Sequence, residues 1–133
     1  MTVVAGIDIQ NIDEVDDALS HFGDRYLRKL FSDPEIDECT SMRRHDVEGL
    51  AARFAAKEAV IKVLRPYDHI PSWRSIEVHL EPSGPMIVLH GEAKEMANRV
   101  GLGTMSLSVS VAREYAIAAV VATLTGPCAT GGR

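Results

Sequence analysis

Asp8 is a carboxylate inside an otherwise apolar segment. It lies within Val3 to Ile9, where alternating residues, several of them β-branched, favour a strand. A carboxylate in such a place is costly unless it is paired, hydrogen-bonded or bound to a metal. An Asp at a strand end that caps a neighbouring turn is the structural alternative, and the strand context alone does not decide between the two.

Glu58 interrupts the apolar face of the clearest helix, which the spacing predicts from about Asp46 to Leu64. Phe54 and Ile61 share its face at spacings of four and three, so a carboxylate stands in a stripe that should be buried. The alternative is an ordinary surface pair with Lys62, four residues on, which contributes only about a few tenths of a kcal/mol.

Six cations accompany Glu58 along the chain: Arg43, Arg44, Arg53, Lys57, Lys62 and Arg65. A basic helix is usually a solvated face, but cations that flank a carboxylate on a half-buried helix fit a site for phosphate and metal better. Asp8 and Glu58, from separate elements, could hold one Mg²⁺, which prefers oxygen ligands and keeps waters and substrate phosphates as the others. The Lys and Arg side chains would then bind phosphate oxygens.

Other catalytic signatures are missing from the sequence. The five histidines have no ligand spacing, so none is assigned a role and zinc is not expected. The sequence holds no GxxxxGK[ST] loop and no GxSxG elbow, and Gly101-Leu102-Gly103 lacks the rest of a dinucleotide fingerprint. Cys39 and Cys128 form neither a disulfide framework nor a metal-type pair.

The elements around these residues follow a mixed pattern. Helical spacing runs from Ile12 to Phe31 with a break near Gly23, and a short helix is expected from about Asp33 to Cys39. After the long helix we expect four strands and one helix: strands Ile76 to Leu80 and Met86 to Leu89, helix Glu92 to Val100, then strands Met105 to Val111 and Tyr115 to Leu124. Helices early and strands later predict an α+β fold, with the long helix packed on a mainly antiparallel sheet.

Length and composition indicate one globular domain, over residues 1–124, with a flexible Gly-rich tail at 125–133. The chain has 133 residues, of which 46% are hydrophobic and 25% charged, which excludes a disordered or fibrous chain. The sequence shows no basic leader and no apolar run of about 18 residues, so we expect a cytoplasmic protein without membrane contact. The net charge of −5 argues against nucleic acid as a partner.

Several motifs resemble those of the holo-acyl-carrier-protein synthases, the short class of the 4′-phosphopantetheinyl transferase superfamily. They are GIDIQNI (Gly6 to Ile12), LAARFAAKEAVIKVL (Leu50 to Leu64), LHGEA (Leu89 to Ala93) and MSLSVS (Met105 to Ser110), and the resemblance spans about residues 3 to 123. It implies the 4′-phosphopantetheinyl transferase-like fold. It also implies an enzyme that moves the 4′-phosphopantetheine group of coenzyme A to a serine of an apo acyl carrier protein, of fatty-acid or polyketide type, and releases 3′,5′-ADP.

The resemblance also implies roles for single residues. Asp8 and Glu58 would bind Mg²⁺, and Glu58, directly or through a metal-bound water, would take the proton of the carrier serine. Lys62 would neutralise the leaving phosphate. The remaining coenzyme A contacts would come from Arg43 and Arg44 at the 3′-phosphate, Arg53 and Lys57 at the nucleotide, and Gly84, Pro85 and Ser110. The carrier would dock on Arg25, Arg28 and Lys29, and the family forms homotrimers with sites between subunits.

Three departures from the family pattern stand beside these matches. Asn11 occupies a position where the family commonly has Glu, and Val109 stands where it usually has His, so a histidine contact to coenzyme A is missing or moved to Ser110. The first helix begins Asp13-Glu14-x-Asp16-Asp17, where relatives present basic residues. These departures motivate an alternative: a non-catalytic relative that binds carrier protein or coenzyme A without transfer. Without the resemblance, another Mg²⁺-dependent phosphotransfer enzyme would be the preferred interpretation.

Overall fold

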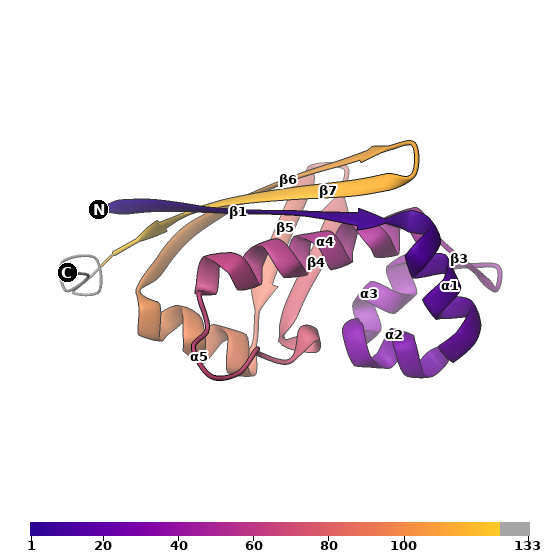
Figure 1. Cartoon of the computed structure of the whole chain (residues 1–133), viewed down its shortest axis with the longest axis horizontal. Helices are drawn as coiled ribbons and strands as arrows, with labels where there is room; N and C mark the ends of the chain where they lie inside the picture. The colour runs from indigo at the N-terminus through magenta and orange to yellow at the C-terminus, as the bar shows by residue number, and fades with distance from the viewer. Residues whose placement is uncertain (126–133) are drawn as a thin grey trace.

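A three-stranded antiparallel sheet and one long helix form the centre of the molecule (Figure 1). The computed structural model describes residues 1–125, so all but the first residue of the expected tail lies outside the described residues. The sheet has the order β1-β7-β6, from β1 (Thr2–Asn11), β7 (Tyr115–Leu124) and β6 (Leu102–Ala112). Helix α4 (Val47–Leu64) lies on one face of it. The predicted α+β fold, a long helix on an antiparallel sheet, is confirmed.

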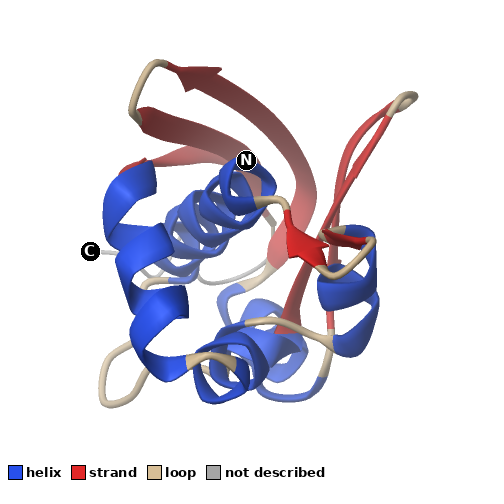
Figure 2. Cartoon of the chain, turned by 90° about the vertical axis from the view of Figure 1, so that its right-hand side faces the viewer, coloured by secondary structure: helices blue, strands red, loops and turns tan. Residues whose placement is uncertain are grey.

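The other elements pack around this unit. Figure 2 shows a second, separate strand pair beside the main sheet, β4 (Ile76–Glu81) with β5 (Gly84–Leu89). Three short helices gather at one end of the molecule, α1 (Ile12–Phe22), α2 (Asp24–Leu30) and α3 (Asp33–Glu38), and α5 (Gly91–Val100) lies at the other. Two small elements were not expected, the β2–β3 hairpin (Thr40–Ser41 and Arg44–His45) and the 3₁₀ turn η1 (Trp73–Ser75). No helix within residues 1–125 has the length and apolarity that crossing a membrane requires.

Helix α4 is the central element, and its burial corrects one expectation. Asp46 caps its start by accepting a hydrogen bond from the Gly49 N–H at 3.0 Å. Twelve of its 18 residues are buried, so the helix has no single buried stripe. The face that carries Phe54, Glu58 and Lys62 is its open side, because the sheet, α1 and β4 cover the rest. Glu58 therefore does not interrupt a buried stripe, as its spacing had suggested, but lies half-buried on the open side of the helix.

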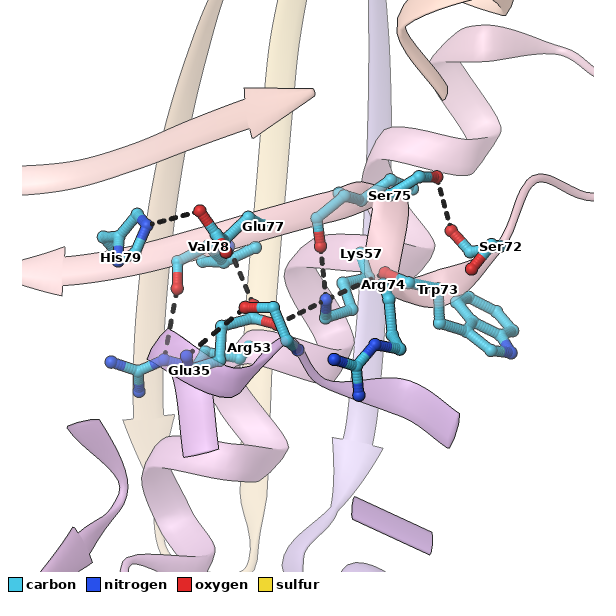
Figure 3. A network of polar contacts seen from close by, with 12 residues as sticks. Glu35, Arg53, Lys57, Ser72, Trp73, Arg74, Ser75, Glu77, Val78 and His79 are labelled. Atoms are coloured by element: carbon cyan, nitrogen blue, oxygen red, sulfur yellow. Dashed lines mark hydrogen bonds and ion pairs between the residues drawn. The ribbon is translucent and has the colours of Figure 1, made fainter. Parts of the chain in front are cut away.

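A buried ion pair joins α3, α4 and β4 (Figure 3). The Lys57 ammonium and the Glu35 carboxylate are fully buried, and Nζ donates to Oε1 at 2.8 Å. Lys57 Nζ also donates to the Trp73 carbonyl at 2.9 Å and to the carbonyl of Ile76. The carboxylate of Glu35 accepts from the backbone N–H of Val78 at 2.8 Å. Every hydrogen-bonding proton of the ammonium thus has a partner, which is the condition under which a buried charge is tolerated.

His79 lies between two carboxylates at the edge of this network. Its Nδ1 is 2.6 Å from Glu38 Oε2 and its Nε2 is 3.1 Å from Glu77 Oε1, so both ring nitrogens face acceptors. Burial lowers the pKa of His79, but the hydrogen bonds and charges of Glu77 and Glu38 outweigh it and raise the pKa above 6.5. The protonated ring therefore stabilises the fold below pH 6.5, and this stabilisation is lost as the pH rises through the raised pKa of the folded protein.

His79→Gln is expected to lower the melting temperature more in acid than in alkali. The difference from the wild type should amount to a few degrees at about pH 6 and should shrink towards about pH 9, because the proton of His79 that is lost in that interval is present only in the wild type. Thermal denaturation of both proteins across the interval measures it. A difference that stays constant with pH would show that His79 stabilises the fold through packing alone.

Candidate functional site

β1 and α4 bring Asp8, Glu58 and Lys62 together. Lys62 Nζ donates to the Ile7 carbonyl at 2.7 Å and to Asp8 Oδ1 at 3.3 Å. Glu58 lies one helical turn before Lys62 on the same open face of α4. Asp8 stands in the middle of its strand and caps no turn, and Lys62 forms its ion pair with Asp8 rather than with Glu58. Both structural alternatives drawn from the sequence are therefore set aside.

The charge of Glu58 is disfavoured at this place. Partial burial raises the pKa of Glu58 above 4.5, the nearby charge of Asp8 raises it further, and Lys62 opposes both effects. Two carboxylates from different elements that are close enough to repel each other, with one of them destabilised in its charged form, are typical of a site that binds a cation or accepts a proton.

The donor set fits a hard divalent cation that keeps other ligands. Within residues 1–125, no group of three or more His, Cys, Asp or Glu side chains is placed to hold a metal by itself. Asp8 and Glu58 supply oxygen atoms from two carboxylates, and Mg²⁺ is commonly bound by one or two carboxylates together with waters and substrate phosphates. The residues present therefore fit Mg²⁺ and do not form a closed cage.

A hollow of about 330 Å³ opens beside Asp8 and Lys62. Its other lining residues are Ile7, Ile9 and Ile117. Ile7 and Ile9 point to the face of the sheet opposite α4 and are 63% and 55% exposed. The candidate site thus lies at the edge of β1, where it borders an exposed apolar surface.

Gly6 allows this approach of strand and helix. A Cβ atom at Gly6 would overlap the carbonyl oxygen of Ala59 and would lie 3.2 Å from Lys62 Cβ. The backbone of β1 therefore runs against α4 two residues before Asp8, which sets the separation between Asp8 and the side chains of Glu58 and Lys62.

Gly6→Ala is expected to push β1 away from α4. The obstacle is the backbone of Ala59, which cannot rotate aside, so we expect the free energy of unfolding to fall by about 1–3 kcal/mol, as is typical of overpacking. We also expect the activity to fall, because the shift of β1 would move Asp8 away from Glu58 and Lys62. Urea denaturation measures the stability, and an assay of the phosphopantetheine transfer that the resemblance implies measures the activity of the same preparation. Gly103→Ala is a useful comparison, since the added Cβ would meet chiefly the Thr123 side chain. Full activity in Gly6→Ala would show that the close approach is not needed.

The structure corrects the expected role of Lys57 and changes that of Arg53. Lys57 is fully buried in the ion pair with Glu35, so it cannot help to hold a nucleotide at the surface. Arg53 donates to Glu38 Oε1 at 2.9 Å and to the Val78 carbonyl at 3.2 Å, and its side chain is buried. A nucleotide contact by Arg53 stays a prediction that requires it to exchange these partners.

The other expected coenzyme A contacts lie in different places. Arg43 and Arg44 are exposed on the β2–β3 hairpin, which in Figure 1 lies beside α1, and no hydrogen bond or ion pair of the described residues joins them to Asp8, Glu58 or Lys62. Their contact with a 3′-phosphate remains a prediction, and within one chain they are separate from the Asp8 site.

The tip of the β4–β5 hairpin borders a second hollow, of about 350 Å³. Pro85 and Val109 both line it, and Gly84 adjoins Pro85 in β5. Ser110 pairs with Ile117 and lies on the outer face of β6, whereas Val109 pairs with the buried Ala118. Ser110 is not among the residues that line this hollow, and its contact with coenzyme A stays a prediction.

The expected carrier patch divides between two hollows. Arg25 and Lys29 frame an apolar hollow of about 430 Å³ on α1 and α2, together with Ala18, Phe22 and Tyr26. Arg28 lines a different hollow, with Asp24, Leu27, Asp33, Ile36 and Asp37. The structure thus brings Arg25 and Lys29 together around an apolar centre and places Arg28 apart from them.

Sequence reasoning missed one polar residue at the site, Gln10, and did not find the role of its neighbour Asn11. Gln10 Nε2 donates to Asp8 Oδ2 at 2.7 Å, and the two-residue period of the strand was the signal that places both side chains on one face. Asn11, which stands where the family commonly has Glu, accepts from the Glu14 N–H at 3.1 Å and caps α1. Its side chain serves the start of the helix.

Comparison with known proteins gives a consistent result. A family model described as the 4′-phosphopantetheinyl transferase superfamily matches residues 5–120. A protein of Koribacter versatilis named holo-[acyl-carrier-protein] synthase is 38% identical over 123 residues, which is 91% of this chain and 98% of the relative. A protein of the same name from Dehalococcoides mccartyi is 42% identical over 119 residues, 88% of this chain and 95% of the relative.

Solved structures agree with these sequence matches. A Chronobacterium ammoniagenes ACPS–CoA complex superimposes with a TM-score of 0.79 at 27% identity, over 95% of this chain and all of that one. The holo-[acyl-carrier-protein] synthase of Helicobacter pylori in complex with coenzyme A gives a TM-score of 0.75 at 28% identity, over 90% of this chain and all of that one.

Proposed function

The chain belongs to the 4′-phosphopantetheinyl transferase superfamily, and from this membership we propose how its own residues carry out the transfer. It is a holo-[acyl-carrier-protein] synthase: it moves the 4′-phosphopantetheine group of coenzyme A to a serine of an apo acyl carrier protein. The serine oxygen forms a bond to the phosphorus of the phosphopantetheine phosphate. The bond from that phosphorus to the bridging oxygen breaks, and 3′,5′-ADP leaves with the electron pair.

Asp8, Glu58 and Lys62 are the residues to which we assign the chemistry. Asp8 and Glu58 would hold Mg²⁺, which would compensate the negative charge of the pyrophosphate of coenzyme A. The Lys62 side chain is half exposed beside Asp8, and its ammonium offsets the negative charge of the departing phosphate. Glu58, directly or through a metal-bound water, accepts the proton of the carrier serine.

This assignment is supported mainly by one observation: the three residues lie close together where Gly6 lets β1 contact α4. The test is a mass-shift assay, in which apo carrier proteins of fatty-acid and polyketide type are incubated with coenzyme A with and without Mg²⁺. A gain of the phosphopantetheine mass that depends on Mg²⁺ and releases 3′,5′-ADP supports the proposal. Coenzyme A binding in calorimetry without modification of any carrier would favour the non-catalytic alternative.

We also assign a homotrimer, assembled through the outer face of the sheet. Val3, Ile7, Ile9 and Val121 form an apolar face that no element within residues 1–125 covers. This face borders the Asp8 hollow, so a second copy would approach the site, and the coenzyme A contacts that one chain leaves apart would come from a neighbour. Analytical ultracentrifugation tests this assembly: a trimer is expected for the wild type and a smaller species for Val121→Arg. A monomeric and fully active wild type would contradict it.

Reversing the charge of Asp16 and Asp17 to Lys is expected to improve modification of a strongly acidic fatty-acid carrier. Both residues lie on α1, next to the hollow framed by Arg25 and Lys29, where they repel an acidic partner. We expect kcat/KM to rise by about tenfold at low salt and the gain to shrink as salt is added. A carrier with a less acidic docking face serves as the control. An unchanged kcat/KM at every salt concentration would show that the carrier does not approach α1.

A further inference from the structure

Gln10 is the closest polar neighbour of the Asp8 carboxylate on the same strand. The two residues share the side of β1 that faces α4, because successive side chains of a strand alternate between faces. Gln10 Nε2 donates to Asp8 Oδ2 at 2.7 Å. Hydrogen bonds to an ionised carboxylate are shorter and about twice as strong as those between neutral groups, and this distance lies at their short end.

The two oxygens of Asp8 have different partners. Lys62 Nζ donates to Oδ1 at 3.3 Å, whereas Gln10 donates to Oδ2. One partner comes from α4 and the other from β1 itself, so together they fix the plane of the carboxylate. Across the sheet, Asp8 pairs with Ala118 and Gln10 with Ala116, and both alanines are buried. The neighbouring strand therefore offers no polar side chain that could take the place of Gln10.

The residue beside Gln10 has a different task. Asn11 directs its side-chain oxygen to the Glu14 N–H at the start of α1. The strand continues through Asn11, so Gln10 is its last residue on the helix-facing side before the chain turns into α1. The strand before Gln10 and the capped helix start after it fix the backbone of Gln10, and this keeps its side-chain amide next to the Asp8 carboxylate.

We propose that Gln10 is a positioning residue that orients Asp8 toward the divalent cation. This inference rests on the proposed function, in which Asp8 and Glu58 hold Mg²⁺. Gln10 donates to Oδ2 and Lys62 to Oδ1, so the carboxylate is held in one orientation in which Oδ1 would be the oxygen offered to the cation. Ligand carboxylates in metal sites are themselves hydrogen-bonded, and loss of such a partner typically costs about 10–100-fold in metal affinity or activity.

The test measures the affinity for Mn²⁺ alone, by electron paramagnetic resonance titration without coenzyme A. Gln10→Leu keeps the approximate size of the side chain and removes the amide, so we expect the Kd for Mn²⁺ to rise about 10–100-fold. In the transfer assay, the Mg²⁺ concentration for half-maximal rate should rise by a similar factor, while kcat at saturating Mg²⁺ should stay within about twofold of the wild type. Asn11→Ser, which keeps a helix cap and does not touch Asp8, is the matched control and should bind Mn²⁺ as the wild type does.

Asp8→Asn in the same titration tests the metal site separately from the positioning role of Gln10. If Asp8→Asn weakens Mn²⁺ binding and Gln10→Leu does not, the positioning role is overturned and the metal site stands. If neither variant changes Mn²⁺ binding, the metal site of the proposed function fails, and the role of Gln10 fails with it. Melting temperatures accompany each titration, and Gln10→Met repeats the test with an unbranched side chain if Gln10→Leu is less stable than the wild type.

Discussion

Replacing Glu58 by Gln is expected to abolish phosphopantetheine transfer and to leave the protein at least as stable as the wild type. Burial and the charge of Asp8 raise the pKa of Glu58, so the folded protein binds the proton of this carboxyl more tightly than the unfolded chain. At neutral pH, ionisation of Glu58 therefore opposes folding, and this cost appears as the pH rises through the interval between the two pKa values. The Gln side chain has nearly the same shape and carries no charge.

The loss of activity has a separate cause. The amide of Glu58→Gln would neither accept the serine proton nor contribute a charged ligand, and loss of a general base alone costs about 10²–10⁴-fold in rate. Transfer rates and urea denaturation on one preparation measure both effects. Glu48→Gln changes an exposed carboxylate on the same helix and should leave the rate unchanged. Glu58→Gln with an undiminished rate would remove Glu58 from the site, and a large loss of stability would mean that the carboxylate mainly supports the fold.

The fold could be predicted largely because its elements are marked by local signals. The helix expected from about Asp46 to Leu64 lies at Val47–Leu64 in the structure, and the strand Tyr115–Leu124 has the expected bounds. The short β2–β3 hairpin escaped prediction, since two-residue strands have no periodicity to recognise. Asp8 and Glu58 stood out for a related reason: each is a charge in a segment of apolar residues.

The partners of a charged side chain could not be predicted from its neighbours in sequence. Lys57 lies among other cations of α4, but its ammonium meets Glu35, 22 residues earlier, and two carbonyls of the segment that leads into β4. Ser110 shows a second limit. Alternation puts it on the face opposite Val109, but which face of β6 turns towards the hairpin depends on how the two strand pairs pack. The partner of Lys57 and the orientation of β6 are both determined by tertiary contacts, which the local sequence does not reveal.

Replacing Lys57 by Met is expected to destabilise the protein by about 3–5 kcal/mol, the usual cost of removing one partner of a buried ion pair. Glu35 would be left as a buried carboxylate without its cation, and the carbonyls of Trp73 and Ile76 would lose their shared donor. Burial lowers the pKa of Lys57 and the charge of Glu35 opposes this shift, so the ammonium depends on that partner to stay charged. Urea denaturation measures the loss.

Lys62→Met is the matched control, because it removes the same side chain from the open face of the same helix. Its stability should fall by no more than about 1 kcal/mol, as for an exposed pair, while transfer is lost. Adding Glu35→Gln to Lys57→Met removes the stranded charge and should recover part of the stability. If Lys57→Met instead kept its stability and lost affinity for coenzyme A, Lys57 would be a nucleotide ligand, as the sequence had suggested, and the buried pair would contribute little. The opposite behaviour of two lysines on one helix therefore decides which of them serves the fold and which the reaction.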